Sequence, residues 1–303
     1  MPDWGEILNE LNSFRPPQHP VDVIRRKYLN LLYKKTSRNI IAYYSAWLQK
    51  GSMQERTAIA DEDKNAFMTA VHNLDPSQGL DLILHTPGGD TAATESLVKY
   101  IKSIFGNNFR VIVPQLAMSA GTMIACASSE IIMGKQSSLG PIDPHYGVVP
   151  CQAVVQEFKD AIAAIKSDPA SLPIWKTMVE KYPPAFVQQC LNAISFSENM
   201  VKGWLKEGMF AGEYDSDIIV EKIVQNLMSF EENKVHARHL HYDDCRSMGL
   251  KILSMEDDNE LQDLILSVHH SFIHTFGFNP LTQKIVENHK GQAMFLNSDI
   301  PRT

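Results

Sequence analysis

Two stretches, residues 80–90 (LDLILHTPGGD) and residues 110–121 (RVIVPQLAMSAG), decide the fold of this chain. Each begins with a short apolar run that is typical of a buried strand, and each ends in a loop of small residues. The segment between them, residues 91–105, carries apolar side chains at helical spacing and predicts a helix. Strands that alternate with helices in this way pair in parallel through right-handed crossovers, so the two stretches predict an α/β fold with a parallel sheet.

The same alternation extends outward along the chain. We expect further strands at residues 40–45 and 130–134 and further helices at 61–74 and 119–128. Beyond Gly134 the pattern becomes helical, at residues 152–166, 184–207, 217–228, 242–249 and 259–290. These patterns divide the chain into an N-terminal helical extension over 1–38, a central α/β domain over 39–258 and a C-terminal helical tail over 259–303.

Composition and charge exclude several classes of protein. Hydrophobic residues make up 44% of the 303 residues and charged residues 21%, which is typical of a globular protein. The formal net charge of −7 argues against nucleic-acid binding, because phosphate contacts need a positive surface. The four cysteines are scattered and suit a reducing compartment. Since we find neither a signal-peptide pattern nor an apolar run that could span a bilayer, we expect a soluble, cytoplasmic protein without membrane association.

The two loops after the quoted strands carry the residue types that acyl transfer needs. The carboxyl ends of parallel strands meet at one edge of a sheet, so Gly88-Gly89 and Ser119 are expected to lie near one another. Gly88 and Gly89 have no side chains, and their backbone N–H groups could stabilise an oxyanion together with the backbone around Ala120. Ser119 opens the following helix, where negative charge is favoured. This pairing predicts a serine nucleophile beside an oxyanion hole.

The stretch from residue 80 to residue 144 resembles the Clp-fold serine peptidases, and within them the serine dehydrogenase proteinase (SDH) family, relatives of SppA and ClpP. The resemblance implies a Clp/crotonase-type fold and a serine endopeptidase with Ser119 as nucleophile and Gly88-Gly89 at the oxyanion position. It implies that residues 137–144 close the active site, with Asp143 and His145 near the substrate. It also implies a homo-oligomer. Because the chain contains no P-loop, ATP-driven unfolding would need a separate ATPase or regulatory partner.

The general base that would activate Ser119 has several candidates. In ClpP-like enzymes a histidine follows the serine by about twenty-five residues, but here Asp143 stands near that position and His145 follows it. SppA-like enzymes use a downstream lysine, for which Lys181 is our first choice over Lys166 and Lys176. His236 and His239 precede a Met-Gly-Leu segment that resembles the end of Clp-type domains, whose triad aspartate lies about a dozen residues earlier.

We expect no catalytic metal and no cofactor. His270 and His274 are four residues apart on a predicted helix, and His236, His239 and His241 are close in sequence, but neither group includes the glutamate of an H-E-x-x-H motif. Two other functions stay open: an acyl-CoA enzyme of the crotonase type, and a scaffold that keeps the fold without catalysis.

Overall fold

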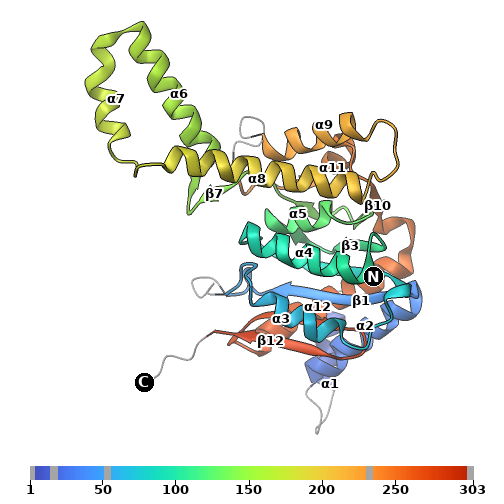
Figure 1. Ribbon diagram of the computed structural model, residues 1–303. Coiled ribbons are helices and arrows are strands. Elements are labelled where there is room, and N and C mark those ends of the chain that lie inside the picture. The colour runs from blue at the N-terminus through green and yellow to red at the C-terminus, as the bar shows by residue number, and fades with distance from the viewer. Residues whose placement is uncertain (1–3, 14–19, 51–55, 230–234, 299–303) are drawn as a thin grey trace, which may run out of the picture.

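A seven-stranded sheet with the order β10-β5-β3-β2-β1-β11-β12 forms the centre of this computed structural model (Figure 1). The structure describes residues 4–13, 20–50, 56–229 and 235–298. The strands of this sheet are β1 (Asn39–Ser45), β2 (Leu80–His85), β3 (Phe109–Val113), β5 (Ile131–Met133), β10 (Ile252–Ser254), β11 (Thr282–Asn288) and β12 (Ala293–Asn297). From β10 to β1 neighbouring strands pair in parallel, whereas β11 pairs antiparallel with β1 and β12 pairs antiparallel with β11.

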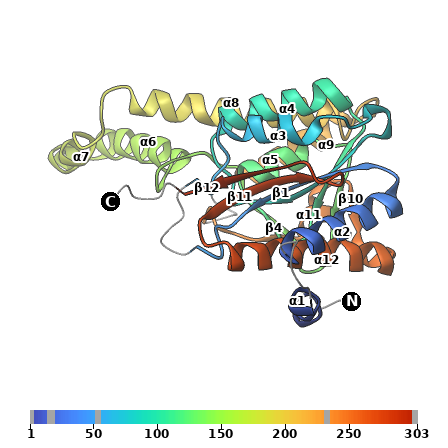
Figure 2. The same cartoon turned by 90° about the horizontal axis from the view of Figure 1, so that it is seen from below.

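Helices cover both faces of the sheet (Figure 2). Because side chains alternate along a strand, Tyr43 and Leu82 pack in one core and their neighbours Tyr44 and Ile83 pack in another. The first core is closed by α3, α4, α5, α8 and α9, and the second by α2 and α12. The helices are α1 (Trp4–Ser13), α2 (Pro20–Thr36), α3 (Asp63–Val71), α4 (Thr91–Phe105), α5 (Ala120–Cys126), α6 (Cys151–Ser167), α7 (Leu172–Val179), α8 (Phe186–Glu207), α9 (Ser216–Met228), α11 (Tyr242–Met248) and α12 (Asn259–Phe278).

The expected α/β class with a mostly parallel sheet and helical regions near both ends is confirmed. Helix α4 has the expected bounds because Asp90 caps its first turn, with Oδ1 accepting from the backbone N–H of Ala93 at 2.7 Å, and Gly106 ends it at φ 59°. The helix expected over 259–290 is wrong beyond residue 278. Residues 282–288 form β11, which joins the central sheet next to β1.

A small second sheet, ordered β4-β6-β9, draws three distant segments together. Its strands are β4 (Leu116–Ala117), β6 (Ser138–Leu139) and β9 (Leu240–His241). Strand β4 leads into Ser119, β6 precedes the loop that holds Asp143, and β9 follows His236. No sequence pattern predicted these two-residue strands, yet their pairing brings the three segments side by side.

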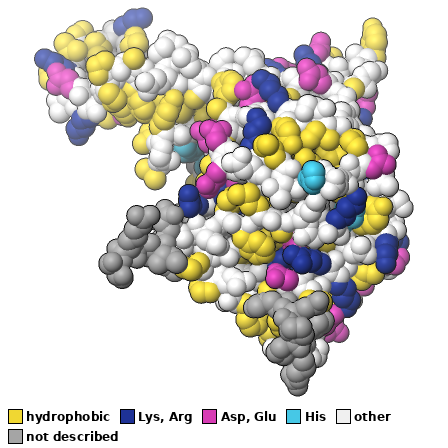
Figure 3. All heavy atoms as spheres, turned by 60° about the horizontal axis from the view of Figure 1, so that its bottom comes forward, with side chains coloured by type: hydrophobic (Ala, Val, Ile, Leu, Met, Phe, Trp, Pro, Cys, Tyr) yellow, Lys and Arg dark blue, Asp and Glu magenta, His cyan; other side chains and the backbone are white. Residues whose placement is uncertain are grey.

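Helices α6 and α7 form an arm that projects from the body (Figure 1). Residues 145–146 (β7) and 149–150 (β8) pair as a short hairpin at its base. Several apolar side chains of the arm are exposed, among them Ile162 at 56% and Ile174 at 67%. Figure 3 shows apolar side chains gathered on the arm at the upper left. Among the described helices, none is both long enough and apolar enough to cross a membrane.

Candidate active site

Ser119 occupies an unusual backbone conformation at the junction between β4 and α5. Its φ of 52° and ψ of −114° lie in a region that residues other than glycine rarely adopt. Such a conformation costs about 1–3 kcal/mol and persists only where the surrounding structure holds it. The half-buried side chain makes no capping hydrogen bond to α5, so the helix does not engage the hydroxyl group.

Backbone hydrogen bonds hold the glycine loop against the serine loop. The N–H of Thr86 donates to the carbonyl of Leu116 at 3.1 Å, and the N–H of Met118 donates to the carbonyl of Thr86 at 3.0 Å. At Gly88 (φ 97°) a Cβ atom would lie 2.7 Å from Ser119 Cβ and 2.7 Å from the carbonyl oxygen of Met118. Only glycine fits this close approach, so Gly88 packs directly on the nucleophile candidate.

Gly89 is held from its other side by Ile59, a residue that the sequence analysis did not single out. The N–H of Ile59 donates to the carbonyl of Gly88 at 2.8 Å, and the N–H of Asp90 donates to the carbonyl of Ile59 at 2.9 Å. Successive N–H groups of an extended segment point in opposite directions, so the N–H of Gly89 points away from Ile59. A Cβ atom at Gly89 would lie 2.3 Å from the backbone nitrogen of Ile59.

A buried ion pair supports the segment that contains Ile59. Lys284 Nζ lies 2.6 Å from Asp63 Oδ1 and donates to the carbonyl of Ala58 at 2.9 Å. Asp63 Oδ2 accepts from the N–H of Ala60 at 2.9 Å and from the hydroxyl of Tyr43 at 3.0 Å. Both charged side chains are fully buried, and burial raises the pKa of Asp63 although Lys284 opposes this shift. Sequence reasoning missed Lys284 because it expected a surface helix there.

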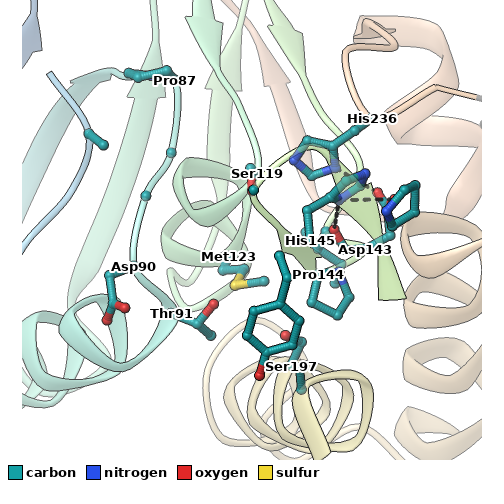
Figure 4. A pocket seen from close by; sticks show the side chains of 18 of the residues that line it. Pro87, Asp90, Thr91, Ser119, Met123, Asp143, Pro144, His145, Ser197 and His236 are labelled. Carbon is teal, nitrogen blue, oxygen red and sulfur yellow. Dashed lines mark hydrogen bonds and ion pairs between the residues drawn. The ribbon is translucent and has the colours of Figure 1, made fainter. Parts of the chain in front are cut away.

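Asp143, His145 and His236 lie together on one side of a cavity that Ser119 also lines (Figure 4). Nδ1 of His236 lies 2.8 Å from Asp143 Oδ1, and Nδ1 of His145 lies 3.0 Å from the carbonyl oxygen of Asp143. The centroids of the two imidazole rings are 4.2 Å apart. Asp143 is only 3% exposed. Burial lowers the pKa of His145, which favours its neutral form.

The cavity has a volume of about 1090 Å³. It is lined by polar side chains from five separate segments of the chain and by apolar side chains such as Tyr146, Val148 and Phe196. Ser119, His145 and His236 all line the cavity, and in Figure 4 their side chains face the same space. The lining residues are Ala58, Pro87 to Ala92, Ser119, Met123, Ile142 to Val148, Pro150, Asn192, Ala193, Phe196, Ser197 and Val235 to Ala237.

The structure separates the candidate residues into two groups. Six of them line the cavity, namely Gly88, Gly89, Ser119, Asp143, His145 and His236, and Ala120 is buried directly behind Ser119. Lys181 and His239 do not line it. Lys181 is exposed in the turn between α7 and α8, and His239 is exposed with its ring centroid 6.2 Å from that of His241.

The other histidine pair lies elsewhere. His274 stacks on Trp4 with ring centroids 3.7 Å apart, and its Nε2 is 3.1 Å from the carbonyl oxygen of Trp4. His270 also packs near Trp4, at 6.0 Å between ring centroids. This pair therefore contacts helix α1 and does not line the cavity. Among the described residues, the only cluster with metal-ligand spacing is Asp143, His145 and His236.

Comparison with known proteins finds one family model and two relatives that match parts of this chain. Residues 53–179, which include Ser119 and Asp143 but not His236, match the family model described as ClpP-like SDH-type serine proteinase. An uncharacterised protein of Methanocaldococcus jannaschii is 38% identical over 188 residues, which cover 56% of this chain and 65% of that protein. A second uncharacterised protein of the same organism is 36% identical over 100 residues, 33% of this chain and 34% of its own length. This chain thus spans less than two thirds of either relative. The resemblance found in the sequence is confirmed over residues 53–179, where the chain is similar to the ClpP-like SDH-type serine proteinases.

Proposed function

We propose that the protein is a serine peptidase in which Ser119 is the nucleophile, His236 the general base and Asp143 the residue that orients the base. The observation that carries this proposal is the 2.8 Å contact between His236 Nδ1 and the buried carboxylate of Asp143, at a cavity that Ser119 also lines. A carboxylate at Nδ1 favours the tautomer that carries its proton there. Nε2 is then the acceptor for the serine proton.

In the proposed reaction, Ser119 Oγ forms a bond to the peptide carbonyl carbon while its proton moves to His236. The resulting oxyanion is stabilised by backbone N–H groups, for which Gly89 and Ala120 are the best donors. Gly88 is a weaker candidate because its N–H donates to Thr86 Oγ1 at 3.2 Å. The C–N bond then breaks as His236 returns the proton to the leaving amine. Water, deprotonated by the same base, hydrolyses the acyl-enzyme.

This assignment exchanges the identities of two triad positions relative to the ClpP-like pattern. Asp143 stands where that pattern has a histidine, about twenty-five residues after the serine. His236 stands about a dozen residues before Met248-Gly249-Leu250, where that pattern has its aspartate. The exchange keeps one imidazole and one carboxylate at the site, and triads are defined by geometry and role rather than by chain order. His145 has no part in the proposed proton transfer.

A peptide substrate suits the cavity. Its volume of about 1090 Å³ reaches the upper end of pockets that hold small ligands, which leaves room for several residues of an extended chain. Apolar side chains at its rim, including Tyr146, Val148 and Phe196, could contact the side chains of such a peptide. Val148 is 92% exposed, as expected for a wall that a substrate covers.

Labelling with a fluorophosphonate probe and turnover of a peptide library test the proposal. Ser119→Ala should abolish labelling, and His236→Gln and Asp143→Asn should each lower the turnover rate by about 10³–10⁴-fold. The controls Lys181→Met and His239→Gln should stay within about twofold of the parent protein. Loss of labelling in Lys181→Met with retention in His236→Gln would replace the triad by a Ser-Lys dyad. No labelling together with binding of acyl-CoA would favour the crotonase-type reaction.

We further propose that the protein forms a homo-oligomer through its projecting arm. Ile162, Leu172 and Ile174 are 56%, 50% and 67% exposed, and burying such side chains against a second copy would stabilise an assembly. Sedimentation equilibrium on the full chain tests this step. The parent protein should sediment as an oligomer and the double variant Ile162→Glu/Ile174→Glu as a smaller species, and a monomeric parent would contradict it.

A further inference from the structure

The cluster of Asp143, His145 and His236 contains more than the proposed triad uses. Asp143 and His236 account for the base and its orienting group, but His145 adds a second imidazole at the same carboxylate. Nδ1 of His145 lies 3.6 Å from Asp143 Oδ2, while Nδ1 of His236 lies 2.8 Å from Asp143 Oδ1. Both carboxylate oxygens of a nearly fully buried aspartate thus face imidazole nitrogens.

The donor set is the one that zinc prefers among carboxylate and imidazole sites. Two neutral imidazoles and one carboxylate make three protein ligands, and zinc sites with three protein ligands keep a position for water or substrate. The side chain of His145 is 15% exposed and borders the cavity, so a cation in the cavity can reach it. Its Nδ1 also lies 3.0 Å from the carbonyl oxygen of Asp143, a contact that it exchanges for the cation on binding.

The three ligand atoms need to move only slightly closer to one another to bind a zinc ion. One ligand atom from each of the three residues lies within 4.8 Å of the others. Ligand atoms about 2.0–2.1 Å from a tetrahedral zinc ion are about 3.3 Å from one another. Rotation of the two imidazole side chains can supply the difference, since both border the open space of the cavity. The same open space leaves room for a water molecule as the fourth ligand.

We propose that Asp143, His145 and His236 bind one zinc-like divalent cation, and that the bound cation silences the site by occupying the base. The second half of this inference rests on the proposed function. Zinc takes the place of the proton that Asp143 and His236 share, so His236 can no longer accept the proton of Ser119. The peptidase is active without the cation and inhibited with it, and a chelator reverses the inhibition.

Calorimetric titration of the full-length Ser119→Ala protein with zinc chloride tests the binding, because this variant needs no activity. We expect one site per chain, and at least a tenfold weaker affinity in the double variant Ser119→Ala/His145→Gln. The matched control is Ser119→Ala/His239→Gln, which changes an exposed histidine outside the cluster and should bind zinc like the parent. Circular dichroism verifies that each variant is folded. Cobalt, bound in place of zinc, should give the visible absorption of a histidine-ligated site, and His145→Gln should reduce it.

Fluorophosphonate labelling of the chain with Ser119 intact tests the inhibition. Labelling that is fast in chelator, slow in zinc and restored by chelator supports the inference. Three results would overturn the inference. They are a zinc affinity that His145→Gln leaves unchanged, a labelling rate that zinc does not lower, and labelling that occurs only in the presence of zinc. If Ser119 is never labelled but zinc binds through the three residues, the metal site stands and the proposed peptidase fails.

Discussion

Replacing Gly88 by alanine tests whether the glycine loop packs on Ser119 as the geometry requires. The new Cβ would lie 2.7 Å from Ser119 Cβ, 2.7 Å from the carbonyl oxygen of Met118 and 2.9 Å from the backbone nitrogen of Ala120. Two of these three neighbours are backbone atoms, which cannot move aside without shifting the start of α5. The loop and the nucleophile must therefore separate.

The expected loss of unfolding free energy in Gly88→Ala has two parts. A φ of 97° strains any residue with a Cβ, and this part costs about 1–2 kcal/mol. Overpacking a close contact costs about 1–3 kcal/mol more. Gly106→Ala isolates the first part, because Gly106 also has a positive φ (59°) but a Cβ there would have no neighbour within 4 Å. We expect a loss of unfolding free energy of about 1–2 kcal/mol for Gly106→Ala and about 2–5 kcal/mol for Gly88→Ala.

Urea unfolding gives the two free energies, and the fluorophosphonate labelling rate reports the site. Gly88→Ala should slow labelling by about 100-fold or more if Gly89 N–H is an oxyanion donor as proposed, because the shifted loop carries this N–H away from Ser119. Gly106→Ala, at the far end of α4, should label at the parental rate. Equal destabilisation by the two substitutions, with unchanged labelling in both, would refute the packing of Gly88 on Ser119.

Two further predictions concern buried charges and pH. Lys284→Met should lower the unfolding free energy by about 3–5 kcal/mol, because it leaves Asp63 buried without its cation. In urea unfolding, the double variant Asp63→Asn/Lys284→Met should recover part of this loss. Equal stability of the single and double variants would contradict the pairing of Asp63 with Lys284. Burial lowers the pKa of His85 from 6.5 to about 4, so this side chain is neutral in the folded protein at a pH where the unfolded chain already binds a proton. Stability is therefore complete above about pH 6.5 and falls by up to about 3 kcal/mol as the pH decreases toward 4, and burial of His269 acts in the same direction. Unfolding free energies at a series of pH values should show a shallower slope for His85→Phe, and an unchanged slope would show that His85 does not contribute.

The local patterns of the central segment were sufficient to predict its architecture. Four of the six residues at 80–85 are leucine or isoleucine, with apolar side chains on both faces, and the segment forms β2 between two parallel neighbours. Asp90 and Gly106 mark the ends of α4 through their own backbone preferences, which act within a few residues. Because parallel strands end at one edge, the meeting of Gly88 with Ser119 was also predictable.

Contacts between distant residues were decided only in three dimensions. The segment 282–288 (TQKIVEN) is polar enough to suggest a surface helix, yet all seven residues are buried as β11. Its charges are tolerated because Glu287 pairs with Arg25 and Lys284 pairs with Asp63, residues more than 200 positions away.

The choice among the candidate general bases also depended on the tertiary structure. Sequence reasoning left Lys181, His145, His236 and His239 as alternatives, since each has a side chain that could accept a proton. The projecting arm carries Lys181 away from the cavity, and the pairing of β6 with β9 brings the segment of His236 to the loop of Asp143 across 93 residues of chain. The alternation of strands and helices was sufficient to predict that Gly88 and Ser119 meet at one edge of the sheet. The position of His236 beside Asp143 depends instead on strand pairing that no local pattern encodes.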